Sequence, residues 1–463
     1  MAYTNRSIVF AIVSVFILVY SALYALTLYS VHQNGFSSEH FIVGSPGGDG
    51  SQYILLAHTL LENGRFSFGP TEPPDTFRTP GYPFFIALML FLTGSIIFMP
   101  IGQIILTACS VALIFLVGAR FFNRGIGLAA AVLFALDPYL SMVMFLSASD
   151  TLFVFVLLLS IYVLTVPERL GLSRAFCGGV LIGMLALVRP IGLYIFPLIV
   201  LWLLWEGRGE WKRALQTMAL FLIGMGLVVV PWMARNYAHY GSASISSIGA
   251  YNLLFYNLTD FEHERTGISK NAVQVAMLKQ MNATSTDPLL SLAFSGREKS
   301  VARTYLEAHP FQYAAYHLYK TIPFYIGSSI DAATEALHGR GVLQGALPLD
   351  VNVTFLILQG NYRTALAALT DSLPSLIERF MWLLLCLASF GITYSALHRR
   401  SANTSVILLF FGLIVAFGIL TGPVSYARYR LPAEPFIFIL GIAGILSAAR
   451  YLKGLRFSHD RQY

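Results

Sequence analysis

Residues 79–119 read TPGYPFFIALMLFLTGSIIFMPIGQIILTACSVALIFLVGA, and this stretch contains no Asp, Glu, Lys or Arg. A helix that crosses a bilayer needs roughly 20 mostly apolar residues, so the stretch has room for two membrane helices. Its first part, Tyr82 to Thr93, either crosses the membrane or lies along its surface. The topology of everything that follows in the chain depends on which of the two is true.

The rest of the chain has the same apolar character. Only 11% of its 463 residues are charged and 56% are hydrophobic, whereas about 25% are charged in an ordinary soluble domain. The mean hydropathy is +0.67. These values exclude a soluble globular protein, a disordered chain and a disulfide-rich secreted scaffold. Further uncharged runs cover Ser7–Ser38, Gly125–Leu136, Thr151–Pro167, Ala175–Val188, Ile191–Trp205, Ala214–Ala234, Phe380–Ala396, Ala402–Ala427 and Pro435–Ala449.

The first of these runs is too long for a signal peptide, and we interpret it as the first membrane span. The three cysteines, Cys109, Cys177 and Cys386, lie inside apolar runs. We expect them to pack as small hydrophobic residues, because their spacing is not that of a redox or zinc motif.

The basic residues predict the orientation, because cytoplasmic loops carry an excess of Lys and Arg. The span ends of one side hold only Arg65, Arg78, Arg189, Arg428 and Arg430, when the long segment 235–379 is set aside. The other side carries Arg6, Arg120, Arg124, Arg169, Arg174, Arg208, Lys212, Arg213, Arg399, Arg400, Arg450, Lys453, Arg456 and Arg461. We therefore expect ten spans with both termini in the cytoplasm, in a membrane that we take to be a bacterial inner membrane.

In this arrangement the segment Tyr82 to Thr93 is a surface or re-entrant helix, since a crossing there would place Arg120 and Arg124 outside. The net charge of +7 is explained by basic inner loops beside anionic lipid, and no nucleic acid partner is expected.

Three parts follow from this organisation. Residues 1–234 form a transmembrane catalytic module with spans one to seven and a first external loop, 32–100, that holds two surface helices. Residues 235–379 form an external loop or lid, and residues 380–463 form spans eight to ten and a cytoplasmic tail. Because no inner segment is long enough for a nucleotide-binding domain, we expect any chemistry on the external side.

Acidic residues mark the candidate site. Asp49 stands in Gly47-Gly48-Asp49-Gly50-Ser51-Gln52-Tyr53, at the start of an amphipathic pattern that predicts a surface helix. Asp150 opens the fourth span, and Asp137 before Pro138 is interpreted as a boundary residue. Acids at membrane depth are functional candidates, but Asp49 and Asp150 have the alternative of merely capping their helices.

Four motifs, in the same order along the chain, resemble the GT-C membrane glycosyltransferases. More narrowly they resemble glycosyltransferase family 39, the protein mannosyltransferase and aminoarabinose transferase group. The motifs are Asp49-Gly50-x-x-Tyr53, Arg78-Thr-Pro-Gly-Tyr-Pro-Phe-Phe, Ser149-Asp150-Thr151-Leu152-Phe153 after Pro138, and Arg428-Tyr-Arg-Leu-Pro-Ala-Glu-Pro435, and the external segment adds Gly249-Ala-Tyr-Asn252 and Ala308-His-Pro310.

The resemblance implies an all-α polytopic GT-C bundle of about ten transmembrane helices, with surface helices at Ser51–Asn63 and Tyr82–Thr93. It implies a catalytic aspartate at Asp49 and a second functional acid at Asp150. Many relatives carry Asp-Glu at the first position, whereas Gly50 follows Asp49 here. Relatives commonly work without a metal, so we expect no metal and no other cofactor, although two carboxylates are chemically suited to a divalent ion.

A membrane enzyme without a cytoplasmic domain takes its sugar from a lipid carrier, and a polyprenyl-monophosphate sugar fits this requirement. Asp49 would act as general base on a hydroxyl of a glycan, lipid or protein acceptor, with inversion at the sugar. Guanidinium groups match phosphate oxygens. The alternative for Arg235, which follows Trp232, is that its side chain only snorkels to the membrane–water interface. The donor-phosphate candidates are Arg78, Arg189, Arg235, Arg428 and Arg430, and the further substrate-cavity candidates are Tyr53, Tyr82, Tyr251 and Asn252.

Two other function classes stay open at the sequence level. A multi-span transporter or a flippase of lipid-linked sugars would suit ten spans, but such proteins usually show related halves with ionisable residues at the midplane. A polysaccharide polymerase or ligase would also use a large external loop. It would have little use for the surface helix that begins at Asp49.

Overall fold

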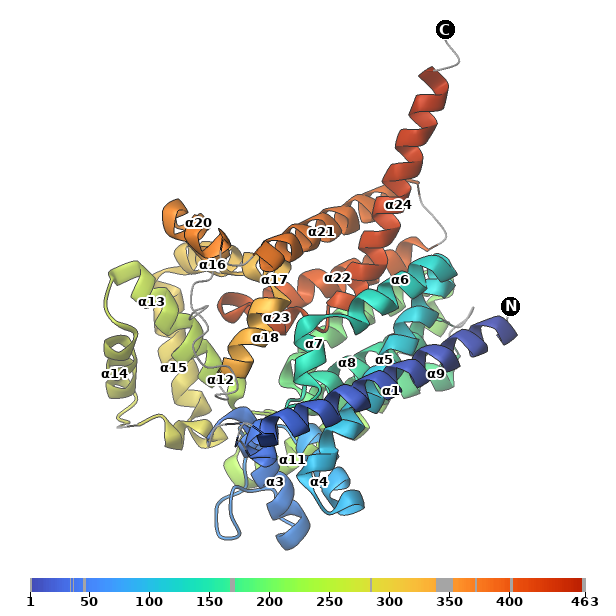
Figure 1. Cartoon of the computed structure of the whole chain (residues 1–463). Helices are drawn as coiled ribbons and strands as arrows, with labels where there is room; N and C mark the ends of the chain where they lie inside the picture. Colours follow the sequence, from blue (N-terminus) through green and yellow to red (C-terminus); the bar gives the residue numbers. More distant parts are fainter. Residues whose placement is uncertain are drawn as a thin grey trace.

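The computed structural model describes residues 2–33, 35, 37–44, 47–166, 171–283, 285–338, 353–370, 373–399 and 403–459. Throughout these ranges the elements are helices (Figure 1), so the predicted all-α fold class is confirmed. Six of the described helices are long and apolar enough to cross a membrane, which makes the chain an integral multi-pass membrane protein. They are α1 (Ala2–Gln33), α5 (Met99–Phe121), α11 (Trp211–Tyr240), α21 (Leu373–Arg399), α22 (Thr404–Thr421) and α24 (Glu434–His459).

The long apolar stretch 79–119 forms two helices, as predicted. The first is α4 (Gly81–Thr93), which ends at Gly94 with a φ of 72°, a conformation that glycine adopts without strain. The 3₁₀ turn η1 (Ile96–Phe98) then leads into α5. Helix α4 is about 20 Å long by the helical rise, less than the ~30 Å hydrocarbon core. It packs on α3 (Asp49–Asn63), where the rings of Tyr53 and Tyr82 meet edge to face at 5.0 Å.

Shorter helices complete the bundle, and close glycine contacts join two of the elements. A Cβ on Gly179 would lie 1.9 Å from the Phe221 carbonyl oxygen, and one on Gly224 would lie 2.3 Å from that of Phe176. Small residues let membrane helices approach in this way, and here they bring α9 (Leu172–Val188) against α11. These shorter elements are α6 (Arg124–Ala135), α7 (Pro138–Val143), α8 (Asp150–Thr165), α9 (Leu172–Val188), η2 (Pro190–Ile195) and α10 (Phe196–Glu206).

A separate helical domain follows α11 and has its own apolar core, which includes Phe255, Leu258, Phe261 and Met277. The expected boundary at residue 234 falls inside α11, which continues to Tyr240. The domain's elements are α12 (Ile248–Asn252), the π-helix η3 (Leu253–Leu258), α13 (Thr259–Thr266), α14 (Lys270–Gln280), η4 (Asp287–Leu290), α15 (Leu292–Ala308) and α16 (Pro310–Lys320).

The chain then returns to the membrane bundle, since Phe324 and Ala332 belong to the main core. The predicted external segment therefore contains one part with a core of its own and one part that packs into the bundle. The remaining elements are α2 (Ser38–Val43), α17 (Ile322–Ile326), α18 (Ser329–His338), α19 (Val353–Leu358), α20 (Tyr362–Thr370), η5 (Gly422–Val424) and α23 (Ala427–Arg430).

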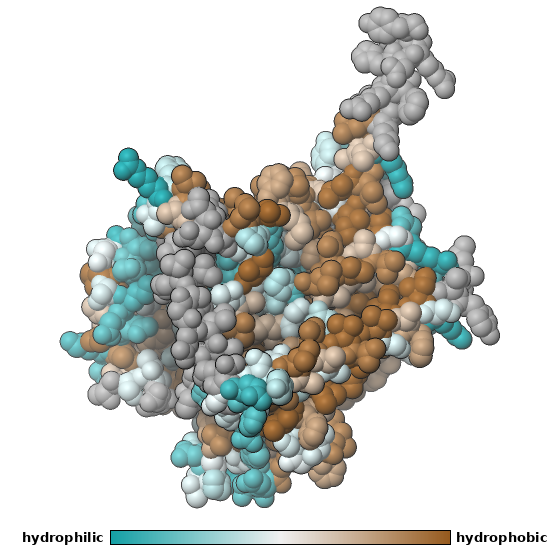
Figure 2. All heavy atoms as spheres, in the orientation of Figure 1, coloured by the Kyte–Doolittle hydropathy of each residue, from teal (hydrophilic) through white to brown (hydrophobic). Residues whose placement is uncertain are grey.

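The bundle has two chemically different ends. The N-terminal end of α1 and the C-terminal end of α24 lie on the right in Figure 1, away from α12 to α16. Figure 2 shows hydrophobic side chains over α1 and hydrophilic ones over the domain of α12 to α16. The end of α5, the end of α8 and the start of α22 were assigned to one side of the membrane from their basic residues, and they are in contact. Arg120 Nε donates to the Val166 carbonyl at 3.2 Å, and Asn403 Nδ2 donates to the Phe121 carbonyl at 2.5 Å. Arg78, Arg189 and Arg428 gather at the opposite end, around the two candidate acids.

Candidate active site

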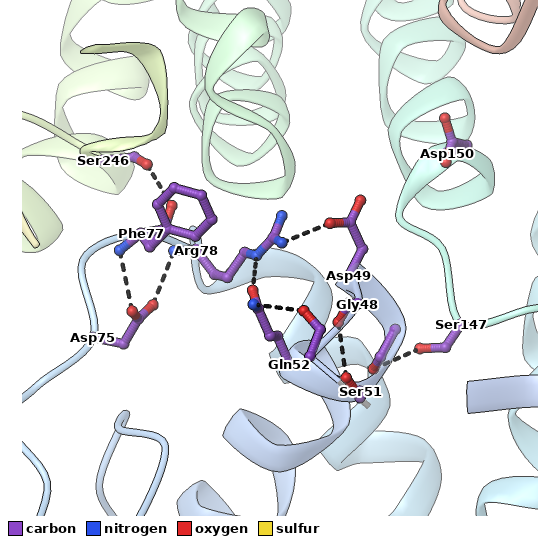
Figure 3. A network of polar contacts seen from close by, with 12 residues as sticks. Gly48, Asp49, Ser51, Gln52, Asp75, Phe77, Arg78, Ser147, Asp150 and Ser246 are labelled. Carbon is purple, nitrogen blue, oxygen red and sulfur yellow. Dashed lines mark hydrogen bonds and ion pairs between the residues drawn. The ribbon is translucent and has the colours of Figure 1, made fainter. Parts of the chain in front are cut away.

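Asp49 is the first residue of α3, but it does not cap the helix. The N-cap position is held by Gly48, and no side chain caps the helix there. The carboxylate instead pairs with Arg78, with 2.6 Å between Asp49 Oδ1 and Arg78 Nη2 (Figure 3). Gln52, one helical turn further on, accepts a hydrogen bond from Arg78 Nε at 2.8 Å. The Asp49 side chain keeps 47% of its surface exposed, so it is accessible to a ligand.

Arg78 is held in place by the loop that precedes α4. The Asp75 carboxylate accepts hydrogen bonds from the backbone N–H groups of Phe77 and Arg78, at 3.2 and 2.9 Å. Burial raises the pKa of Asp75 to about 6 in spite of these bonds. The Arg78 guanidinium lies 5.0 Å from the centre of the Tyr53 ring, which is within the range of a cation–π contact. Arg78 therefore enters the site with a fixed orientation.

Asp150 begins α8 and is also not a cap, because Ser149 holds the N-cap position and no side chain caps the helix. It is fully buried, and each of its oxygens has a cationic partner. Arg189 Nη1 lies 2.6 Å from Oδ1, and Arg428 Nη2 lies 3.3 Å from Oδ2. Asp49 and Asp150 therefore form ion pairs and do not cap their helices.

Arg428 connects the two acids, since its Nη2 is also 3.6 Å from Asp49 Oδ2. The charges alternate in the order Arg78, Asp49, Arg428, Asp150, Arg189. The five residues come from α3, the loop before α4, the start of α8, the end of α9 and α23. One network therefore contains both predicted acids and three of the five predicted arginines.

A cavity of about 310 Å³ lies beside this network. Asp49 and Arg428 line it, whereas Arg78, Asp150 and Arg189 are not among its lining residues. Asp150 therefore lies behind Arg428 and acts on the guanidinium, and the acid of the network that lines the cavity is Asp49. The wall is formed by Val43, Gly44, Gly48, Asp49, Gly50, Tyr139, Val143, Leu146, Ser147, Ala148, Ala332, Glu335, Ala336, Tyr426 and Arg428.

Gly50 accounts for the missing second acid of the Asp-Glu pattern. A Cβ at this position would lie 2.3 Å from the Val43 carbonyl oxygen and 3.1 Å from that of Ser147. Ser147 Oγ also approaches the Gly50 carbonyl at 3.5 Å (Figure 3). A glutamate therefore does not fit at Gly50 unless α3 moves away from both Val43 and the segment around Ser147.

The charges around Asp49 set its protonation. Burial would raise the pKa of the Asp49 carboxyl, but the guanidinium groups of Arg78 and Arg428 lower it by more, so the pKa lies below the usual range. Asp49 is ionised at neutral pH. Within the described chain, the buried Arg428 Nε has no hydrogen-bond partner. This donor is therefore not used by any described residue.

The structure places two of the predicted arginines elsewhere. The accessibility expected of Arg430 is wrong, because this side chain is fully buried. It pairs with Glu434 at 3.1 Å, donates to the Phe324 and Gly327 carbonyls and to Ser329, and lies 3.7 Å over the Trp382 ring. These partners occupy the guanidinium inside the bundle, where a lipid phosphate does not reach it.

Arg235, on α11, lies outside the charge network. Its Nη atoms donate to the carbonyls of Asp75 and Phe66, at 2.6 and 3.2 Å, and its guanidinium stacks 4.4 Å from the Trp232 ring. It therefore anchors the loop that carries Arg78.

The four other cavity candidates do not line the cavity. Tyr82 is fully buried and donates from its hydroxyl to Gln103 Oε1 at 3.1 Å, so its side chain packs inside the protein and not in the wall of this cavity. The Tyr53 ring makes a cation–π contact with the Arg78 guanidinium, and Tyr251, on α12, packs edge to face on Phe77 at 5.5 Å. Asn252 ends the same helix. Tyr53 and Tyr251 therefore support the loop and helix that carry the site.

Sequence reasoning missed Gln52, Tyr139, Tyr426 and Glu335. Gln52 had a usable signal, because it follows Asp49 by three residues and so shares its helix face. The other three reach the cavity only through tertiary packing. In the described residues, no group of three or more His, Cys, Asp or Glu side chains is placed to hold a metal ion.

Comparison with known proteins gives one family and a set of solved structures. The family model described as dolichyl-phosphate-mannose-protein mannosyltransferase matches residues 77–234. A search of curated proteins finds no match. The apo oligosaccharyltransferase of Archaeoglobus fulgidus superposes with a TM-score of 0.50 at 12% identity, over 99% of this chain and 53% of that one. The chain thus spans about half the length of this relative.

Two more solved structures resemble the chain less closely. One is the AglB oligosaccharyltransferase of Archaeoglobus fulgidus with an inhibitory peptide and a dolichol-phosphate, at a TM-score of 0.47, 14% identity and coverage of 98% and 52%. The other is ArnT of Cupriavidus metallidurans bound to undecaprenyl phosphate, at a TM-score of 0.39, 14% identity and coverage of 91% and 77%. The likeness to the apo oligosaccharyltransferase establishes the fold: the chain is an all-α polytopic membrane protein with the GT-C fold of membrane glycosyltransferases.

Proposed function

We propose that this protein is a membrane glycosyltransferase that moves a sugar from a polyprenyl-monophosphate carrier to an acceptor hydroxyl on the external face. The observation that carries the proposal is the cavity in which the exposed Asp49 carboxylate faces the Arg428 guanidinium. A transferase of this kind needs a base for the hydroxyl and a cation for the leaving phosphate. The family model that matches residues 77–234 is named for a lipid-phosphate sugar donor, which supports the same reading.

The reaction is a single displacement. Asp49 accepts the proton of the acceptor hydroxyl while the oxygen of that hydroxyl forms a bond to the anomeric carbon. The bond between that carbon and the phosphate oxygen breaks, and the polyprenyl phosphate leaves with the electron pair. Arg428 stabilises the negative charge on the phosphate, and attack opposite to the leaving group inverts the sugar.

The ion pairs couple donor binding to base strength. Without donor, Arg78 and Arg428 keep the pKa of Asp49 low, and a base with a low pKa is a weak one. A donor phosphate that binds Arg428 competes with Asp49 for the guanidinium, so the pKa of Asp49 rises when the donor is in place. Asp150 holds the other side of Arg428 and is itself held by Arg189, so these two act as positioning residues.

The assay supplies membranes that contain the protein with a panel of radiolabelled undecaprenyl-phosphate hexoses and pentoses, and measures label transferred to envelope material. Asp49→Asn keeps the shape of the side chain and removes the base, so we expect transfer to fall by at least roughly 100-fold. The matched control is Glu62→Gln, on the same helix and 69% exposed. Equal transfer by wild type and Asp49→Asn, or no consumption of any donor by the wild type, would contradict the proposal.

A further inference from the structure

A second cavity lies at the opposite end of the bundle from Asp49. It has a volume of about 420 Å³ and is formed by the ends of α5, α8, α10, α11 and α22. Helix α8 joins the two regions, with Asp150 at one end and Thr165 at the other. Its 16 residues correspond to about 24 Å at the helical rise. The second cavity is therefore at the other boundary of the apolar bundle.

Two cations and two carboxylates line this cavity. Arg120 is fixed through Nε, which donates to the Val166 carbonyl at 3.2 Å. Arg213 and Glu210 form a loose pair at 3.7 Å, and Glu206 accepts a hydrogen bond from Ser405. The formal charges of these four lining groups cancel. A ligand that matches them carries one positive and one negative charge.

A buried donor in the cavity wall has no hydrogen-bond partner among the described residues. Trp202, on α10, lines the cavity with 8% of its surface exposed, and its indole Nε1 makes no hydrogen bond to any described residue. Buried tryptophan N–H groups usually find an acceptor, and an unsatisfied polar group at membrane depth is costly. An anionic oxygen in the cavity would supply this acceptor after a small adjustment of the ring.

The two helices that form the cavity wall also carry exposed apolar side chains. Leu201, Leu204 and Trp205 on α10, and Leu215 on α11, are exposed large hydrophobic residues on the two helices that form its wall. On a helix that lies in the bilayer, such a surface contacts acyl chains. A molecule that binds here therefore has a charged head in the cavity and hydrocarbon along α10 and α11.

We propose that this cavity binds the headgroup of a zwitterionic phospholipid that carries a phosphate diester and a primary ammonium group. The phosphate oxygens face Arg120 and the Trp202 indole N–H. The ammonium group, which donates three hydrogen bonds, faces Glu206 and Glu210. A choline headgroup has no N–H donor, and a glycerol headgroup has no cation, so both fit the cavity less well.

The test measures thermal unfolding of the purified, delipidated full chain in detergent, with added dioctanoyl phosphatidylethanolamine, phosphatidylcholine or phosphatidylglycerol. We expect phosphatidylethanolamine to raise the unfolding temperature at a concentration at least tenfold lower than the other two. Trp202→Phe, which keeps the ring, and Arg120→Gln should weaken its effect. Glu206→Gln should remove the preference for ethanolamine over choline. Arg124→Gln, which replaces a nearby arginine outside the cavity lining, should respond like the wild type.

Soluble phosphoethanolamine distinguishes a lipid from a free phosphate ester. We expect it to have no effect at the concentration where the lipid acts, because it lacks the acyl chains. The proposal is wrong if the three lipids act equally, if phosphoethanolamine reproduces the lipid effect, or if the Trp202→Phe and Arg120→Gln variants respond like the wild type. Each of these results is readable without the transfer reaction, so the outcome is independent of the proposed activity.

Discussion

At the scale of single residues, the site depends on which ion pairs face the cavity and which are enclosed. Asp49 and Arg428 line the cavity, whereas Asp150 is buried behind them and Arg430 is buried in the bundle. Arg428 and Arg430 are two residues apart in the same motif. Their different surroundings predict different consequences of mutation.

We expect Arg430→Met to destabilise the protein by about 3–5 kcal/mol, because it leaves Glu434 buried without its cationic partner. The double variant Arg430→Met with Glu434→Leu removes both charges and should recover part of the loss. Thermal unfolding in detergent measures both. A stable Arg430→Met protein with a selective loss of donor binding would instead return Arg430 to the donor site.

At the scale of elements, the existence and the ends of the short helices were the most predictable features. The helices expected at Ser51–Asn63 and Tyr82–Thr93 are observed as Asp49–Asn63 and Gly81–Thr93, because hydrophobic periodicity and Pro-Gly signals act locally. Asp137 was predicted to be a boundary residue and caps α7, accepting from the Leu140 N–H at 2.8 Å. The alternative that Asp49 and Asp150 are caps was not resolvable from the sequence. Each of their partners Arg78, Arg189 and Arg428 lies at least 29 residues away along the chain, and Arg428 lies 278 residues from Asp150.

Helix α15 contains an element-scale feature without a sequence signal. Glu298 is fully buried in the α12–α16 domain, and neither carboxyl oxygen has a hydrogen-bond partner among the described residues. Burial raises its pKa from 4.5 to about 8. Between these values the folded domain keeps the proton while the unfolded chain releases it, so stability falls as the pH rises through this window.

We therefore expect Glu298→Gln to raise the unfolding temperature of the protein at pH 8 and to have a much smaller effect near pH 5. Unfolding curves at the two pH values measure the difference. Glu307→Gln on the same helix is the control, since Glu307 is exposed and paired with Arg303. An equal shift at both pH values for Glu298→Gln would show that Glu298 does not titrate in this window.

At the scale of the whole molecule, the sequence predicted the membrane class, the all-α fold and the grouping of loops at two ends. These features follow from hydropathy and from the distribution of Lys and Arg, which are counted segment by segment and do not depend on tertiary contacts. The division of 235–379 was less predictable, because α17 and α18 rejoin the bundle through long-range contacts such as those of Phe324 and Ala332. The cavity lining was the least predictable, since Glu335 and Tyr426 reach it only in the folded chain.

Orientation in the membrane is tested with single cysteines at the two ends of α11, in a background without Cys109, Cys177 and Cys386. Ala238 lies at the end near the Asp49 site, and Gly209 precedes the other end. Both are exposed. We expect an impermeant thiol reagent to label Ala238→Cys in intact cells and to label Gly209→Cys only after permeabilisation. The reverse pattern would invert the topology and place the proposed chemistry in the cytoplasm.

The most direct test of the account is the titration of undecaprenyl phosphate into the purified protein in lipid nanodiscs, with undecaprenol as the control that lacks the phosphate. The account predicts that Arg428→Ala weakens binding of the phosphate at least tenfold and that Arg428→Lys restores only part of it, because lysine does not form the bidentate contact. Asp49→Asn should bind it no more weakly than the wild type. If Arg428→Ala binds undecaprenyl phosphate like the wild type, the phosphate is not held beside Asp49 and the central claim is contradicted.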